Sequence, residues 1–359
     1  MTAKIDLFGS STLGKLTLQN RLVMAPMTRS RALGNVPNAL MAAYYQQRSG
    51  AGLIITEGTS PSPNGLGYAR IPGLFNADQV RGWKSVTDAA HSGGAKIFVQ
   101  LMHTGRVTHP ANLPSGAGMV APSAIAAPGQ MWTDAEGMKD HPAPRAMSEE
   151  EIQQAVSEFG QSAKLALEAG FDGVEIHGAN GYLVDQFLNT ASNQRTDSWG
   201  GSIGNRARFA IEVVKAVAAA IGPERTGIRL SPYGVFNGMQ PDAEMDALFL
   251  HLAREFDKLK LAYVHIVDHS SMGAPPVSAE LKAKIRESFK GIYILSGGYD
   301  RERAEADLAA GKGDLVAFGR PFISNPKLVQ KLKERAPLAT PDMNTFYTPG
   351  EQGYTDYPV

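Results

Sequence analysis

Short, unbroken apolar runs recur along the chain, and stretches with helical periodicity lie between many of them. Apolar runs of this kind are typical of parallel strands that are covered on both faces. Eight runs occur, at residues 21–25, 52–56, 96–101, 173–177, 227–230, 263–267, 292–296 and 315–318. A 3.6-residue period predicts helices between them, including residues 148–169, 203–221, 242–258 and 300–310.

Local signals mark the ends of several of these helices. Ser148 is followed by three glutamates, which predicts a serine N-cap with acidic residues in the first turn, and Gly170 follows the last helical residue. Pro241 precedes the helix expected from Asp242, and Asp300 has the position of another N-cap.

The alternation of eight strands with helices predicts an α/β fold, a (β/α)8 TIM barrel, because neighbouring parallel strands need crossover helices. An open, doubly wound sheet is the alternative, but eight regularly spaced units favour closure. Alternating residues within 5–20 predict an N-terminal hairpin at the barrel floor. The Pro- and Gly-rich residues 104–146 predict a long excursion over the mouth after the third strand. We expect residues 1–359 to form a single barrel domain.

Composition narrows the class of function. Of the 359 residues, 43% are hydrophobic and 19% are charged, which suits a globular protein with a sizeable core. Thirty-five basic and 35 acidic residues give a formal net charge of zero, so we expect no general attraction to nucleic acid or anionic membranes. Without Cys, the chain has no disulfide, thiol nucleophile, Cys-ligated zinc or iron–sulfur cluster. No apolar run approaches the roughly 20 residues that span a bilayer, and the first residues lack a signal-peptide core, so a cytoplasmic location is expected.

The carboxyl ends of barrel strands carry the chemistry of this fold. The last two strands run into glycine, in the segments LSGGYD (295–300) and AFGRP (317–321). Glycine lets backbone N–H groups approach a phosphate, and Arg320 adds a cation suited to bidentate binding. Tight turns alone would explain one such glycine, but two sets on neighbouring strands favour a phosphate site.

The fourth strand ends in HGANGY (177–182), which places an imidazole, an amide and a phenol close together. His177 and Asn180 can donate hydrogen bonds to one carbonyl oxygen or oxyanion, and Tyr182 can deliver a proton. A single His or Tyr at a strand end usually packs or caps, but the convergence of three such groups favours catalysis.

Two further strand ends carry polar residues where aliphatic side chains are usual, Gln100 and Arg229. A bound polar ring would explain both. The alternative for Arg229 is a structural ion pair with Glu57 or Glu175.

His265, Asp268 and His269 have the composition of a metal site, but their spacing across a strand end gives no converging set, so no metal is expected. Glu57 and Glu175 could imitate a glycosidase carboxylate pair, although Glu175 lies inside a strand.

Taken together, these motifs resemble the old yellow enzyme family of FMN-dependent ene-reductases, in its bacterial branch of N-ethylmaleimide, pentaerythritol tetranitrate and glycerol trinitrate reductases. The resemblance runs almost from end to end. It is carried by NRLVMAPMTRSRA (20–32), YYQQRSGAGLIITEGT (44–59), VQLMHTGR (99–106), GFDGVEIHGANGYLVDQFLN (170–189), NQRTDSWGGSIGNRARF (193–209), GIRLSP (227–232), VAFGRPFISNP (316–326) and GYTDYP (353–358).

The resemblance implies an FMN site at the barrel mouth. Its cofactor-binding residues, matched by position, would be Pro26, Met27, Thr28, Gly58, Gln100, Arg229, Gly298, Gly319 and Arg320. Gln100 would bond the pyrimidine edge of the flavin, Arg229 would stabilise its reduced anion, and Arg320 would bind its phosphate.

The resemblance also implies a reaction. NADPH or NADH would reduce FMN, and hydride would then pass to the β-carbon of an α,β-unsaturated carbonyl compound, or to a nitro or nitrate-ester substrate. His177 and Asn180 would bind the substrate oxygen, and Tyr182 would be the proton donor. Other residues implied to line the substrate pocket are Tyr68, Met102 and Tyr347. Close relatives carry Trp in place of Met102, and residues 125–145 match poorly. The resemblance leaves a monomer and a homodimer both open.

Other classes of protein remain as alternatives. A dienoyl-CoA reductase or amine dehydrogenase on a related barrel would need an iron–sulfur cluster, which a chain without Cys cannot bind. A cofactor-free isomerase, aldolase or glycosidase could use Glu57 and Glu175, and a small-molecule binding protein could keep the barrel without turnover. A yellow purified protein that oxidises NADPH with 2-cyclohexenone would separate the flavoenzyme from these.

Overall fold

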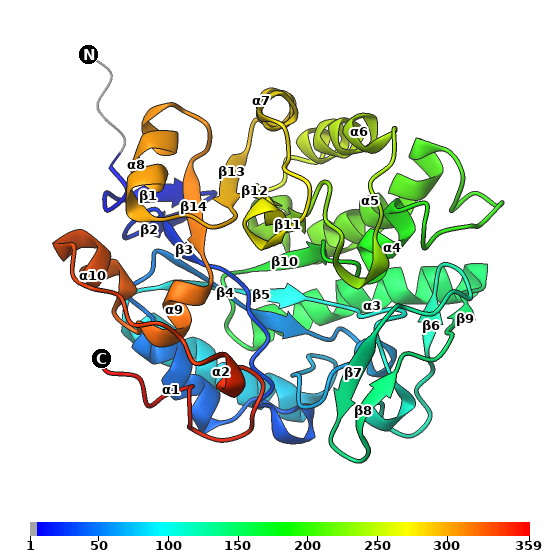
Figure 1. Cartoon of the computed structure of the whole chain (residues 1–359), viewed down its shortest axis with the longest axis horizontal. Helices are drawn as coiled ribbons and strands as arrows, with labels where there is room; N and C mark the ends of the chain where they lie inside the picture. Colours follow the sequence, from blue (N-terminus) through cyan, green and yellow to red (C-terminus); the bar gives the residue numbers. More distant parts are fainter. Residues whose placement is uncertain (1–5) are drawn as a thin grey trace.

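The computed structural model describes residues 6–359, and in them eight parallel strands close into a barrel (Figure 1). The strands are β3 (Leu22–Met24), β4 (Leu53–Thr59), β5 (Lys96–Leu101), β10 (Gly173–Gly178), β11 (Thr226–Leu230), β12 (Tyr263–Val267), β13 (Ile292–Ser296) and β14 (Leu315–Phe318). Each strand pairs with the next one along the chain, and β14 pairs with β3 to complete the ring. The predicted barrel is therefore confirmed, and all eight apolar runs form its strands.

Helices surround the strands (Figure 1). They are α1 (Ala39–Gln47), α2 (Ala77–Ser92), α3 (Glu149–Glu168), α4 (Leu183–Leu188), α5 (Ile203–Ile221), α6 (Met245–Lys258), α7 (Ala279–Ser288), α8 (Arg301–Ala309), α9 (Arg320–Ser324) and α10 (Leu328–Glu334). Short 3-10 turns occur at η1 (Leu33–Asn35), η2 (Pro63–Gly65), η3 (Pro110–Asn112), η4 (Pro223–Arg225), η5 (Phe236–Gly238), η6 (His269–Met272) and η7 (Met343–Thr345). Within residues 6–359, no helix has both the length and the apolar composition to cross a membrane.

The predicted helix starts are confirmed at positions where a side chain caps the helix. Ser148 caps α3 in a complete capping box, and the Asp300 carboxylate accepts a hydrogen bond from the third residue of α8 at 2.8 Å. The helix expected from Asp242 begins only at Met245. The Asp242 carboxylate accepts the N–H of Glu244 at 2.9 Å, and this local turn delays the helix.

The N-terminal hairpin consists of β1 (Ser11–Leu13) and β2 (Leu16–Leu18), which pair antiparallel. Ile5, the first residue of the segment expected to form it, lies outside the described residues. Leu13 and Leu18 are fully buried in one cluster with inward residues of the barrel strands, such as Leu53. The hairpin therefore closes the floor of the barrel.

The excursion between β5 and α3 contains two small sheets. β6 (Val120–Ala121) pairs with β9 (Arg145–Ala146), and β7 (Gln130–Thr133) forms a hairpin with β8 (Gly137–Asp140). Arg70 links this hairpin to the C-terminal part of the chain, because it pairs with Asp134 and donates to the carbonyl of Tyr347 at 2.8 Å. The predicted excursion is present, and its hairpin lies beside the barrel mouth (Figure 1).

The last residues return to the barrel and are held there by three buried arginines. Arg29, Arg31 and Arg48 are at most 2% exposed. Together they donate hydrogen bonds to backbone carbonyls between residues 345 and 354. The Tyr354 ring stacks on Tyr44 with 4.0 Å between centroids. We call residues 345–354 the C-terminal clasp.

Candidate active site

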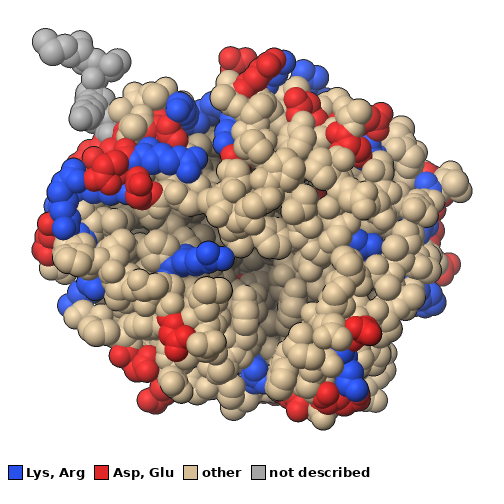
Figure 2. Space-filling model, in the orientation of Figure 1, with Lys and Arg blue, Asp and Glu red and all other residues tan. Residues whose placement is uncertain are grey.

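A cavity of about 810 Å³ opens at the carboxyl ends of the barrel strands. The face of the molecule in Figure 2 is hollowed near its middle, with a basic side chain beside the hollow. The predicted site residues that line the cavity are Pro26, Met27, Thr28, Tyr68, Asn180, Tyr182, Arg229, Gly298, Gly319, Arg320 and Tyr347. The barrel therefore brings most of the predicted residues to one place.

Four predicted residues, Gly58, Gln100, Met102 and His177, are not among those that line the cavity. Met102 is 1% exposed and packs in one cluster with Tyr68 and Tyr182. A Cβ at Gly58 would lie 2.5 Å from the Met102 sulfur, so the absence of a side chain at this position leaves room for Met102. The His177 ring lies edge-on to the Tyr182 ring, with centroids 4.9 Å apart.

Gln100 belongs to a buried polar chain across the strands. Its Nε2 donates to Glu175 Oε1 at 2.8 Å, and Glu175 Oε2 lies 2.8 Å from His265 Nδ1. Glu175 is fully buried and serves as the acceptor for both neighbours. This carboxylate therefore braces the barrel interior and does not face the cavity.

Arg229 is the buried cation of the cavity. It is 7% exposed, and within residues 6–359 it has neither an ion pair nor a side-chain hydrogen bond, with its Nε fully enclosed. Burial lowers the pKa of Arg229, and the Glu175 carboxylate opposes this effect. An unpartnered buried cation is strongly unfavourable. Arg229 therefore fits a ligand that brings an anion or hydrogen-bond acceptors, as a flavin ring does.

Glycines shape another wall of the cavity. Gly297 and Gly298 have φ values of 125° and 62°, which residues other than glycine rarely adopt. A Cβ at Gly298 would also lie 2.8 Å from Cβ of Ser271, a residue that lines the cavity. Arg320 is exposed on the same cavity wall, at the start of α9. A turn of two glycines and a guanidinium with no hydrogen-bond or ion-pair partner in residues 6–359 together suit a phosphate group.

The turn after β10 fixes the substrate-side residues. Asn180 has a φ of 60°, and its N–H donates to Ser231 Oγ at 3.0 Å. The next N–H, of Gly181, donates to Asp185 Oδ2 at 2.8 Å. Asp185 is 6% exposed, and burial raises its pKa to about 7. Ser231 and Asp185 thus hold the turn that carries Asn180 and Tyr182.

Hydrogen bonds and burial define which side chains of this turn carry a proton. The N–H of Ala179 donates to His177 Nδ1 at 3.3 Å, so the neutral ring carries its proton on Nε2. Burial, followed by Arg229, lowers the pKa of His177 well below its usual value, which keeps the ring neutral. The hydroxyls of Tyr182 and Tyr68 lie 3.1 Å apart, and burial raises the pKa of Tyr182. The turn therefore carries a neutral imidazole with its proton on Nε2 and a protonated phenol, and the phenol of Tyr182 lines the cavity.

The remaining candidates are not brought together. Glu57 is fully buried beside the Tyr45 hydroxyl, away from the cavity lining, and burial raises its pKa to about 7. His265 bonds Glu175, whereas His269 Nε2 lies 2.7 Å from Asn180 Oδ1. In the described part of the chain, no three acidic or histidine side chains are grouped to hold a metal ion.

Several cavity residues were not predicted from the sequence. They include Phe236, Asn237, His269, Met272, Met343 and Phe346. The first four lie in short turns after β11 and β12, where the loops of a barrel carry function, so their position was a usable signal. The last two come from the C-terminal part, whose return to the mouth has no periodic signature.

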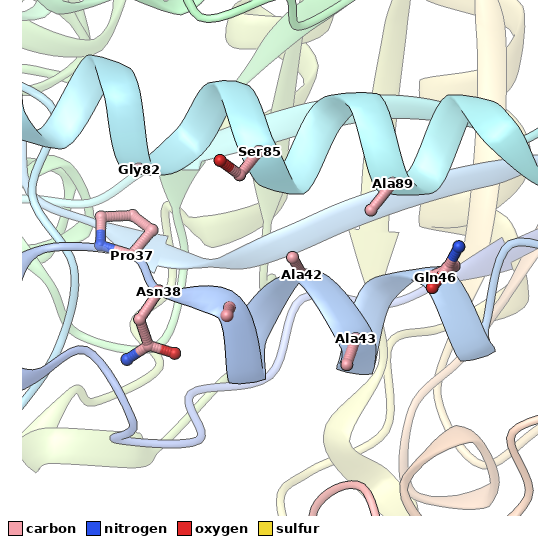
Figure 3. Close-up of a pocket in the computed structure, with 9 residues that line it drawn as sticks. Pro37, Asn38, Ala42, Ala43, Gln46, Gly82, Ser85 and Ala89 are labelled. Atoms are coloured by element: carbon pink, nitrogen blue, oxygen red, sulfur yellow. The ribbon is translucent and has the colours of Figure 1, made fainter.

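A second hollow lies between α1 and α2 (Figure 3). Its lining consists of Pro37, Asn38, Ala39, Ala42, Ala43, Gln46, Gly82, Ser85 and Ala89, none of which is titratable. A Cβ at Gly82 would lie 2.4 Å from the Pro37 carbonyl, so the small residue serves the packing of this chain. Catalytic chemistry is therefore assigned to the barrel mouth.

Comparison with known proteins agrees with this assignment. The sequence profile of the NADH:flavin oxidoreductase / NADH oxidase family matches residues 6–339. A probable flavin mononucleotide-dependent alkene reductase from Leishmania infantum is 42% identical over 350 residues, 96% of this chain and 95% of the relative. The structure of morphinone reductase in complex with tetrahydroNAD has 45% identity and a TM-score of 0.93, covering 98% of this chain and 97% of that one. The old yellow enzyme homologue from Zymomonas mobilis has 41% identity and a TM-score of 0.93, covering 98% and 99%.

Proposed function

Because the chain belongs to the NADH:flavin oxidoreductase / NADH oxidase family, we propose that it is an FMN-dependent ene-reductase with NADPH or NADH as its reductant. The resemblance to old yellow enzyme homologues is confirmed by the solved structures. The observation that carries the proposal is Arg229, which is buried without an ion pair or side-chain hydrogen bond among residues 6–359 and lines the same cavity as Asn180 and Tyr182. When bound, FMN supplies hydride chemistry, accepting hydride from the nicotinamide and delivering it to an electron-poor alkene.

The residues present fit FMN. Arg229 would face the pyrimidine side of the flavin ring and stabilise negative charge there, which relieves the cost of its own burial. Gln100 would turn its amide toward the same edge of the ring. Gly298, Gly319 and Arg320 would hold the phosphate, and the ring would rest against Pro26, Met27, Thr28 and the backbone of Gly58.

The substrate would be an α,β-unsaturated carbonyl compound, with nitro and nitrate-ester compounds as further candidates. His177 Nε2–H and the Asn180 amide would bind its oxygen, where enolate charge develops. Donors aimed at such charge in a dry site are worth about 3 kcal/mol each. Tyr182 would protonate the α-carbon, because its raised pKa keeps the phenol protonated until a strongly basic carbon accepts the proton. Tyr68, Met102 and Tyr347 would border the substrate.

Two measurements test this function. The purified protein should be yellow and release FMN on denaturation, and it should oxidise NADPH when 2-cyclohexenone is supplied. Yellow protein without enone-dependent turnover would favour a binding protein, and colourless protein that takes up no added FMN would contradict the proposal. His177→Ala should retain FMN but weaken phenol binding and its long-wavelength absorbance band, because one of the two oxygen donors is lost.

We further propose that residues 1–359 act as a single FMN-binding domain, in the cytoplasm, as a monomer or homodimer. The absence of any expected attraction to nucleic acid or membrane leaves small molecules as the partners of the cavity. Light scattering during size-exclusion chromatography of the holoenzyme distinguishes the two assembly states.

A further inference from the structure

His269 occupies a place in the cavity that the proposed reaction leaves without a role. It begins the turn η6 after β12, is 8% exposed and lines the cavity. Its Nε2 lies 2.7 Å from Asn180 Oδ1. The ring of Phe236 packs edge-to-face against the imidazole, with centroids 4.7 Å apart, and this contact restricts its orientation.

The backbone of Asn180 is fixed, but its amide group has two orientations. The N–H of Asn180 donates to Ser231 Oγ at 3.0 Å, and its carbonyl accepts from Asn237 Nδ2 at 2.7 Å. Rotation of the side-chain amide by half a turn exchanges its oxygen and nitrogen in nearly the same volume. Packing alone therefore does not decide which of the two atoms faces the cavity.

The orientation of the Asn180 amide decides whether a donor or an acceptor faces the substrate oxygen. With the amide oxygen toward His269, the NH2 group remains to donate to a carbonyl or nitro oxygen in the cavity. With the amide reversed, an amide oxygen would face the substrate oxygen, and two acceptors repel each other. Burial, followed by the charge of Arg229, lowers the pKa of His269 to about 4, while Asp268 opposes the shift. The neutral ring has one N–H to give.

We infer that His269 donates its Nε2 hydrogen to Asn180 Oδ1 and so keeps the Asn180 amide in the orientation that binds the substrate oxygen. His269 is thus a positioning residue, acting through Asn180 and setting the affinity of the site for carbonyl and phenolate oxygens. The inference rests on the proposed function, because that function gives the donor its substrate.

A double-mutant cycle on the holoenzyme tests the inference, with phenol as the probe and the long-wavelength absorbance band as the readout. His269→Phe keeps the ring against Phe236 but removes the donor, so the dissociation constant of phenol should rise about tenfold, the value of one hydrogen bond. His269→Gln restores an N–H and should remain within about threefold of the wild type. In an Asn180→Ala background, His269→Phe should change the constant by less than about twofold, because there is no amide left to orient.

The outcomes separate this inference from its premise. Full additivity of the two substitutions, or unchanged phenol affinity in His269→Phe, would overturn the positioning role. A wild-type protein that holds no FMN would instead contradict the proposed function. FMN content and melting temperature, measured on every variant, show whether a loss of affinity comes from a damaged fold.

A second readout does not depend on turnover. In protein labelled with 15N-histidine, the ring signals of His269 are those that disappear in His269→Phe. They should show a protonated Nε2 and an unprotonated Nδ1. The opposite tautomer would overturn the inference, because Nε2 could then only accept from the amide.

Discussion

Replacing Asp185 by Asn removes a buried carboxyl group while keeping its shape and its acceptor oxygen. Asp185 is 6% exposed, and its carboxyl accepts a hydrogen bond from the Gly181 N–H at 2.8 Å. Burial raises its pKa from 3.8 to about 7, against the smaller opposing effect of that hydrogen bond. Desolvation therefore dominates the pKa of Asp185. The same carboxyl holds the turn that carries Asn180 and Tyr182.

The sign and size of the effect follow from the two protonation equilibria. Below pH 3.8 the carboxyl is neutral in the folded and the unfolded protein. Between pH 3.8 and about 7 the unfolded chain releases the proton and the folded one keeps it, so the free energy of unfolding falls by about 1.4 kcal/mol per pH unit. Above pH 7 the loss levels off near 4 kcal/mol. The variant's NH2 group, if unpaired, costs about 1–3 kcal/mol at every pH. The change in the variant's relative stability between two pH values therefore isolates the effect of ionising the Asp185 carboxyl.

Equilibrium urea unfolding at about pH 5 and about pH 8 measures this change. We expect the stability of Asp185→Asn relative to the wild type to rise by about 3 kcal/mol from the lower to the higher pH. Asp356→Asn, at an exposed position, is the matched control and should show no such rise. If the relative stability of Asp185→Asn were the same at both pH values to within about 1 kcal/mol, the carboxyl would not be neutral and buried as described.

Three further predictions test the site and the clasp. Tyr182→Phe should retain FMN and its reduction by NADPH but slow enone turnover at least about 100-fold, whereas Tyr68→Phe should lose less than about tenfold; equal losses in stopped-flow assays would argue against Tyr182 as the donor. Arg229→Met should raise the dissociation constant of FMN at least about tenfold, followed by flavin fluorescence, and an unchanged constant would place the flavin elsewhere. Tyr354→Ala should lower the free energy of unfolding by about 3 kcal/mol, because it removes a ring stacked on Tyr44; a loss under 1 kcal/mol in urea titrations would mean that the clasp adds little stability.

The barrel could be predicted from the sequence because its strands are buried on both faces and read as unbroken apolar runs. Helix starts were predictable where one side chain makes the cap, as at Ser148 and Asp300. At Asp242 the same type of residue forms a local turn, and the helix begins at Met245. Residue type alone does not distinguish a cap from such a turn, because both satisfy backbone N–H groups.

Part of the candidate site was predictable because closure of the barrel brings the carboxyl ends of all its strands together. Arg229 and Asn180 reach the cavity for this reason. The orientation of individual side chains was not predictable: Gln100 bonds Glu175, and His269 bonds Asn180, and neither partner could be inferred from the sequence. Long-range hydrogen bonds of this kind depend on strand register, which a single sequence does not encode locally.

The C-terminal clasp binds arginines that follow the first barrel strand, β3. During translation, residues 345–354 leave the ribosome after every barrel strand has been made, and until then the guanidinium groups of Arg29 and Arg31 lack most of the carbonyls that they bind in the folded protein. A barrel without this segment would therefore contain two guanidinium groups that lack most of their hydrogen-bond acceptors, which is costly for buried cations. The same segment supplies Phe346 and Tyr347 to the cavity lining, so the contacts that satisfy these arginines also complete the wall of the binding site.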